Sequence, residues 1–168
     1  YISQMQNGLL TQLVRIKLGD HIEEAHMRNR ALIAHWALAH SSGRGQDGKD
    51  VMELVQRDGK TYVRINDYEA LRTLFGELLA EIQRIKSTGD FEAARQLVET
   101  YAVHIEYDIH KEILERYEIL NIAPYKGFIN PVYTAVKDAD GNITDVTVSY
   151  TEGYAEQMLR YSRDYSIE

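Results

Sequence analysis

Apolar side chains recur at helical spacing through the first part of the chain. In the opening stretch they stand three or four residues apart, at Ile2, Met5, Leu9, Leu13 and Ile16. This spacing places them on one face and predicts an amphipathic helix at the start. Gly19 and Asp20 then supply a helix stop and an N-cap, so a second helix is expected from Asp20 to about Ala39.

The longest predicted helix begins at Asn66, because Glu69 three residues later completes a capping box. Its apolar face is formed by Leu71, Leu74, Phe75, Leu78, Leu79, Ile82 and Ile85. Gly89 ends this helix and Asp90 caps the next one, which runs to about Tyr101. A shorter helix around residues 109–117 follows, and three helices in series indicate a bundle.

Between the second helix and the long one, the pattern is typical of strands. The segments 51–56 and 61–65 flank Asp58-Gly59, a dipeptide that favours the tight turn between antiparallel strands. We therefore expect a β-hairpin inserted between helices, at about residues 51–65.

A second hairpin is predicted after Pro124. Segments 128–136 and 143–150 are rich in β-branched residues and surround a turn that contains Asp140-Gly141. A final helix is expected from about Glu152. The predicted fold class is α+β and mainly α: a helical bundle with an inserted β-hairpin, followed by a C-terminal β-hairpin and helix.

Composition narrows the range of functions. The 168 residues include 26 acidic and 19 basic ones, giving a formal net charge of -7, and no block of Lys and Arg would attract nucleic acid. No apolar run is long enough to cross a membrane. The lack of cysteine excludes disulfides and thiolate zinc sites, and we expect a cytoplasmic location. Because Tyr1 is not an initiator methionine and no cap precedes the first helix, we expect a piece of a longer protein.

Six histidines invite a metal-site interpretation, and His21-Ile-Glu-Glu-Ala-His26 superficially resembles a zinc-peptidase helix. The spacing argues against it, since histidines five apart lie about 140° apart around a helix, whereas zinc chelation from a helix needs a spacing of four. Ile22 also stands where the general-base glutamate would follow the first histidine. A histidine-based metal module is thus disfavoured. The other histidines are expected to be surface or satisfied core residues: His35, His40, His104 and His110.

His26 and Arg30 differ, because they are four apart and share a helical face with Ile22 and Ile33. A histidine and an arginine on a partly apolar face need a partner, since an unpaired polar group there is costly. That partner is either an internal salt-bridge network or a bound ligand, and the spacing leaves both open.

Around these two residues, the stretch Glu24-Ala-His-Met-Arg-Asn-Arg30 resembles the dipeptidyl peptidase III family of zinc exopeptidases. Two further stretches agree in order and spacing. They are Ile82-Gln-Arg-Ile-Lys-Ser-Thr-Gly-Asp90, leading into Ala94-Arg95 and Tyr101-Ala102, and Tyr125-Lys-Gly-Phe-Ile-Asn-Pro131. The resemblance covers nearly the whole chain.

The resemblance implies a zinc metallopeptidase that removes dipeptides from the N-termini of peptides, in a cleft between two lobes. In that family a His-Glu-x-x-x-His helix and a glutamate of a Glu-Glu-x-x-Ala helix hold the zinc, and both motifs lie upstream of the matched segment. Neither motif occurs in these 168 residues. We therefore expect zinc in the intact parent, none bound by this chain, and no activity of the chain alone.

By the same resemblance, His26 matches a histidine that stabilises the developing charge on the scissile carbonyl. Arg30 matches an arginine of the same cleft, and Lys126 a lysine near the hinge to the second lobe. Tyr125 stands where relatives can have arginine, and Glu24 where some have glutamine. Arg30, Lys126, Glu24 and Tyr125 are the expected substrate contacts.

Residues 1–124 are accordingly expected to be the helical part of the catalytic lobe, and residues 125–168 the hinge, hairpin and C-terminal helix of the second lobe. Peptides are the expected substrates. An apolar stripe on the last helix also predicts self-association through the C-terminal hairpin or helix; it consists of Tyr154, Met158, Tyr161 and Tyr165. The alternative is a non-catalytic helical protein-interaction module. The parent's upstream sequence separates the two, because only the enzyme needs both zinc motifs there.

Overall fold

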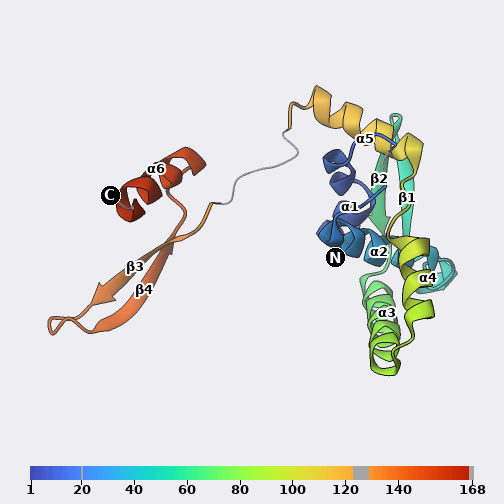
Figure 1. The fold of residues 1–168 in the computed structure, drawn as a ribbon, viewed down its shortest axis with the longest axis horizontal. Coiled ribbons are helices and arrows are strands. Elements are labelled where there is room, and N and C mark those ends of the chain that lie inside the picture. The colour runs from blue at the N-terminus through green and yellow to red at the C-terminus, as the bar shows by residue number, and fades with distance from the viewer. Residues whose placement is uncertain (20, 123–128, 167–168) are drawn as a thin grey trace. The chain divides into compact units, whose positions relative to one another are not determined.

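The structure is a computed structural model that describes residues 1–19, 21–122 and 129–166. The chain divides into two compact units, Tyr1–Pro124 and Tyr125–Glu168 (Figure 1). The architecture is α+β and mainly α, with one hairpin inserted between helices and a second hairpin followed by a final helix. This confirms the predicted fold class. Among the described residues, no helix combines the length and apolarity needed to cross a bilayer.

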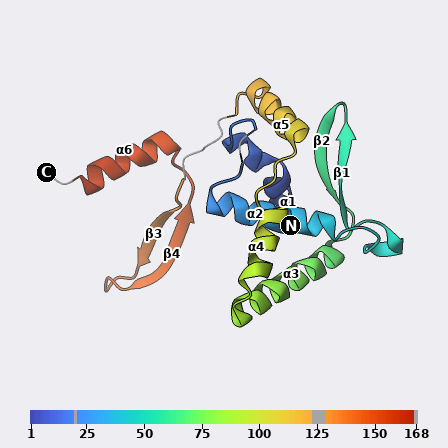
Figure 2. The ribbon, with the colours of Figure 1, turned by 45° about the vertical axis from the view of Figure 1, so that its right-hand side comes forward.

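The first unit is built around one central helix. In chain order its elements are α1 (Ile2–Leu9), a 3-10 segment (Thr11–Arg15), α2 (Ala25–Ala39), a 3-10 turn (Gln46–Gly48), β1 (Met52–Arg57), β2 (Lys60–Ile65), α3 (Tyr68–Thr88), α4 (Phe91–Tyr101) and α5 (Tyr107–Ile119). Helix α2 contacts α1, α3 and α4, and Figure 2 shows it running through the middle of the unit. The core gathers buried side chains from α1, α2, β1, α3 and α5, including Met5, Ala34, Met52, Leu71 and Ile113.

The beginning of the chain differs from the prediction in two places. The expected single helix up to Ile16 stops at Leu9, and the chain continues as the 3-10 segment. Helix α2 begins at Ala25 and is capped by Glu24, so the predicted start at Asp20 is wrong; Asp20 itself lies outside the described residues. The periodicity persists through both pieces because a 3-10 turn keeps apolar residues on nearly the same side.

The β1–β2 hairpin forms as predicted. Asp58 and Gly59 both have positive φ, 51° and 70°, which suits a tight turn with the twist of the flanking strands. Pairing runs from Met52 opposite Ile65 to Arg57 opposite Lys60. One face is buried against the helices, and the Ser41 hydroxyl ties down the strand start by bonding both the N–H and the C=O of Met52 at 2.7 Å.

Helix α3 is capped by Asp67 and not by the predicted Asn66. The Asp67 carboxylate accepts the Ala70 N–H at 2.9 Å. Asn66 instead donates its side-chain amide to the Asp50 carbonyl and to the Glu53 carboxylate. The predicted cap is therefore wrong by one residue. The Asn66 side chain binds Asp50 and Glu53 at the hairpin, whereas the Asp67 side chain caps the helix.

The long apolar face of α3 is buried over its first half only. Leu71, Leu74 and Leu78 are buried, whereas Leu79 and Ile82 remain 57% and 37% exposed. The end of the helix agrees with the prediction. Gly89 adopts the left-handed conformation that ends α3, and Asp90 caps α4 through the Ala93 N–H.

The second unit consists of β3 (Val132–Lys137), β4 (Ile143–Ser149) and α6 (Tyr154–Tyr165). In the turn, the Asp138 carboxylate accepts the N–H groups of Asp140 and Asn142 at 3.0 and 2.9 Å. The hairpin is formed as predicted, although β3 begins at Val132; the predicted start at Phe128 lies outside the described residues. No residue of either strand is buried.

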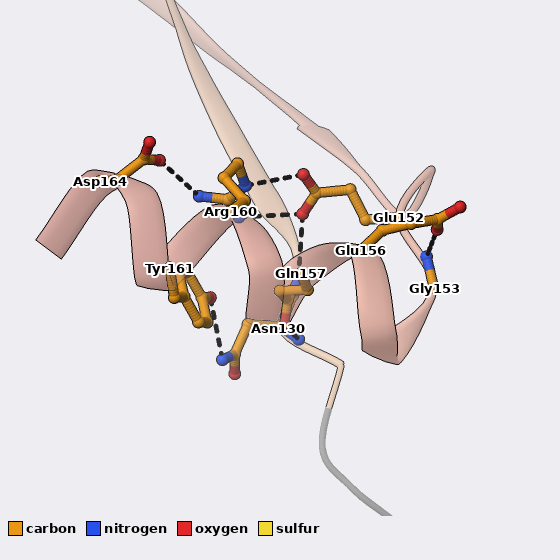
Figure 3. Close-up of polar contacts among 8 residues, drawn as sticks. All are labelled: Asn130, Glu152, Gly153, Glu156, Gln157, Arg160, Tyr161 and Asp164. Atoms are coloured by element: carbon orange, nitrogen blue, oxygen red, sulfur yellow. Dashed lines mark hydrogen bonds and ion pairs between the residues drawn. The ribbon is translucent and has the colours of Figure 1, made fainter. Parts of the chain in front are cut away.

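Polar side chains hold α6 to the segment that enters β3 (Figure 3). Gln157 is fully buried, and its amide bonds both backbone groups of Asn130 at 2.8 Å. On the same helix Arg160 bonds Glu152 with two N–H groups, at 2.6 and 2.9 Å. The Gln157 side-chain amide thus joins α6 to the segment before β3 through two hydrogen bonds to the backbone of Asn130, like those between neighbouring strands.

Candidate functional site

The start of α2 brings together three of the predicted site residues. Glu24 is the N-cap, and its carboxylate accepts the N–H groups of His26 and Met27 at 3.0 and 2.9 Å. These bonds, that from His26 above all, lower the pKa of the Glu24 carboxyl below its ordinary value. Glu24 therefore enters the site as a fixed carboxylate at the positive end of a helix.

His26 and Arg30 lie one helical turn apart on α2. His26 is exposed and Arg30 half-buried. Neither side chain makes a hydrogen bond or ion pair with another residue that the structure describes. The internal salt-bridge network, one of the two partners considered for this pair, is therefore absent from the described part of the chain. Both groups are free to meet a ligand.

The backbone beneath Arg30 is fixed by a close helix crossing. A Cβ atom at Gly8 of α1 would lie 2.4 Å from the Arg30 carbonyl oxygen and 2.5 Å from the Ala34 Cβ. Only glycine fits at this distance, so α1 rests directly against the backbone of α2. The backbone of α2 at Arg30 is thus packed tightly against α1.

An open hollow of about 460 Å³ adjoins the capped end of α2. It is lined by Arg15, Ile16, Lys17, Gly19, His21, Glu23, Glu24 and Met27. Charges of both signs meet here, with Ile16 and Met27 as apolar contacts. Such a lining suits a small zwitterionic group, for example the charged end of a peptide.

A buried histidine that the sequence analysis did not assign to the site holds one wall of this hollow. His110 of α5 is fully buried, and its Nε2 lies 3.0 Å from the carbonyl oxygens of both Leu13 and Ile16. Because carbonyls only accept, Nε2 carries the proton and donates to both. His110 thereby fastens the segment that carries Arg15 against α5. Its position three residues before Ile113 on an apolar face was the only available signal.

His35 and His40 have structural roles. His35 bonds the Tyr101 carbonyl through Nδ1 at 3.0 Å, and burial lowers its pKa. His40 bonds the Trp36 carbonyl at 2.8 Å and stacks on the Trp36 ring. Among the described residues, no group of three or more His, Asp or Glu side chains is placed to hold a metal ion.

The other two predicted site residues, Tyr125 and Lys126, lie outside the described residues. Glu24, His26 and Arg30 lie within two turns at the start of α2, and of these three only Glu24 lines the hollow. Comparison with protein-family models gives no match for this chain, and comparison with curated proteins gives none either.

Proposed function

We propose that the chain is part of a zinc metallopeptidase of the dipeptidyl peptidase III type, which releases dipeptides from the N-termini of peptides. The proposal starts from the Glu24 to Arg30 motif. The observation that carries it is the state of His26, whose side chain is exposed in the first turn of α2 and has no hydrogen-bond or ion-pair partner among the described residues. A side chain in this state is ready to donate to an oxyanion.

Each residue then has a defined task. His26 donates an N–H to the scissile carbonyl oxygen as negative charge develops there. Arg30, one turn further along α2, binds a carbonyl or carboxylate of the same peptide. The capping carboxylate of Glu24 retains acceptor capacity for a peptide N–H or terminal amine. Tyr125 and Lys126 are proposed substrate contacts on the resemblance alone.

Zinc supplies Lewis acidity and an activated water in peptidases of this type. Neither zinc motif of that family occurs in these 168 residues, so we propose that the parent's upstream motifs hold the metal. The isolated chain should then release no dipeptides. In the parent, residues 1–124 would belong to the catalytic lobe and residues 125–168 to the second lobe.

The test is the variant His26→Ala in the intact parent. Turnover of a dipeptidyl arylamide should fall by about 10² to 10³, the usual loss for one oxyanion donor, while zinc content stays at the wild-type level. The matched control is His104→Ala, since His104 is an exposed histidine that lies outside the motif and outside the hollow. Unchanged turnover in His26→Ala, or loss of zinc with loss of activity, would contradict the proposed role.

The second candidate function is a non-catalytic interaction module. One observation favours it: the second hairpin exposes large apolar side chains, with Tyr133 67%, Val148 53% and Val146 48% exposed. A contiguous apolar surface of this kind marks an interaction site. This candidate gains if the parent lacks peptidase activity and the chain self-associates through the hairpin or α6.

A further inference from the structure

One edge of the β1–β2 hairpin carries backbone groups that point away from the ladder. In a hairpin closed by a two-residue turn, the pair next to the turn exchanges backbone hydrogen bonds, and bonded and unbonded pairs then alternate. With Arg57 opposite Lys60, this alternation directs the N–H and C=O groups of Thr61, Val63 and Ile65 to the outer edge of β2.

Helix α5 satisfies only the first of these three positions. The Thr61 N–H donates to the Glu112 carboxylate at 2.9 Å, and its C=O accepts from Arg116 at 3.0 Å. The backbone groups of Val63 and Ile65 make no hydrogen bond outside the hairpin to any residue that the structure describes. Beyond Thr61, the edge of β2 is therefore open for pairing.

A groove of about 550 Å³ runs along this open edge. Helices α1 and α5 contribute Ile2, Gln6, Leu10, Ile113, Tyr117 and Leu120 to its lining. The hairpin contributes residues of both faces, since Tyr62 and Arg64 alternate with Val63 and Ile65 along the strand. The groove thus follows the edge itself and has an apolar helical side.

The hairpin side of the groove, with Arg116 of α5 beside it, is basic. Arg57, Arg64 and Arg116 line it, and no acidic residue does, although the whole chain has a formal net charge of -7. Arg64 and Arg116 each pair with a glutamate, whereas Arg57 makes no ion pair with a described residue. Arg57 and Arg64 share one hairpin face, which gives the groove one arginine side and one apolar side.

We propose that this groove binds an extended, acidic segment of another polypeptide, which adds to the hairpin as a third strand beside β2. The open groups of Val63 and Ile65 select an extended backbone. The arginine face selects carboxylates at alternate positions, and the helical face selects apolar side chains between them. The proposal concerns a docking surface and stands apart from the proposed peptidase chemistry.

The probe is the acetylated and amidated peptide Val-Glu-Val-Glu-Val-Glu, titrated into the 168-residue chain and followed by amide NMR and hydrogen exchange. Binding should slow the exchange of the Val63 and Ile65 amides and leave β3 and β4 unchanged. Arg64→Gln should weaken binding by about fivefold, as expected for one cross-strand charge pair, because Arg64 lies on β2 beside the added strand. Arg72→Gln is the matched control, because Arg72 is an exposed arginine of α3 that does not line the groove.

Two peptide controls complete the design. A version N-methylated at alternate residues cannot donate to the edge and should not bind, and a version with lysine for glutamate should bind at least tenfold more weakly. The proposal is overturned if the lysine peptide binds equally, or if Val63 and Ile65 keep their exchange rates at saturating peptide. The proposal is also overturned if these amides exchange slowly without peptide, in a self-associated chain or in the intact parent, because another segment would then occupy the edge.

Discussion

The two hairpins of this protein share their local chemistry and differ in what covers them. Each turns at an Asp-Gly pair, and each carries β-branched residues on its strands. The β1–β2 hairpin buries Met52 and Thr61 against helices, to 1% and 3% exposure. In the β3–β4 hairpin no strand residue is buried. The same kind of turn thus occurs in both hairpins, whereas burial of one face depends on neighbouring elements.

The largest expected difference follows from truncating one apolar side chain in each hairpin. Met52→Ala should lower the free energy of unfolding of the first unit by about 3 kcal/mol, because a buried side chain is lost and a cavity remains. Val146→Ala, 48% exposed in β4, should cost about 0.5 kcal/mol or less. Urea unfolding measures the first effect through Trp36, the one tryptophan. A Met52→Ala chain as stable as the wild-type chain would show that burial does not distinguish the two hairpins.

The next test concerns the polar clamp of the second unit. Gln157→Ala should destabilise the attachment of α6 by about 2 kcal/mol, since two hydrogen bonds between the buried Gln157 amide and the Asn130 backbone are lost. Amide exchange at Asn130 should accelerate accordingly. Leu159→Ala serves as the control, because Leu159 lies on the same helix and is 66% exposed. Equal exchange at Asn130 in both variants would show that the clamp does not hold the unit together.

A smaller effect is expected where the first hairpin leads into α3. Asp67→Ala should cost about 1 kcal/mol, the usual loss for an N-cap, because the Ala70 N–H loses its acceptor. Asp67→Asn should cost less, since asparagine caps as well and only the bond from the Gln46 N–H to the second carboxylate oxygen is lost. Thermal unfolding compares the two. If Asn66→Ala proved the more damaging substitution, the capping assignment would have to return to Asn66.

The smallest expected effect is a pH dependence of the contact between β2 and α5. Burial raises the pKa of Glu112, but the bonds from Thr61 and the charge of Arg116 more than offset this, so the net pKa lies below the ordinary 4.5. A lowered pKa stabilises the contact fully above about 4.5, and the contribution is lost as the pH falls through the folded value. Exchange at the Thr61 amide, corrected for intrinsic rate, should therefore accelerate under acid. Glu112→Gln should abolish that acceleration; its persistence would implicate another group.

Local signals predicted the elements well and their boundaries less well. Asp58-Gly59, Gly89 and Asp90 all act as the sequence indicated, because a turn or cap involves only a few adjacent residues. Asn66 failed as a cap because Asp50 and Glu53, distant in sequence, use its amide. The motif from Glu24 to Arg30 pointed to the candidate site. The contacts of His110 and the groove beside β2 were not predicted, because they join residues that are far apart in the sequence.

The sequence by itself determined where the chain turns, which residues share a helical face and that two hairpins form, since backbone preference and side-chain period decide these locally. Only the tertiary structure decided that α3 is buried over half its length, that His110 holds the wall beside Glu24, and that the edge of β2 stays open beyond Thr61. These outcomes depend on which distant groups come within hydrogen-bond or van der Waals range. Such proximity is set by the packing of whole elements, so it cannot be predicted from any single stretch of residues.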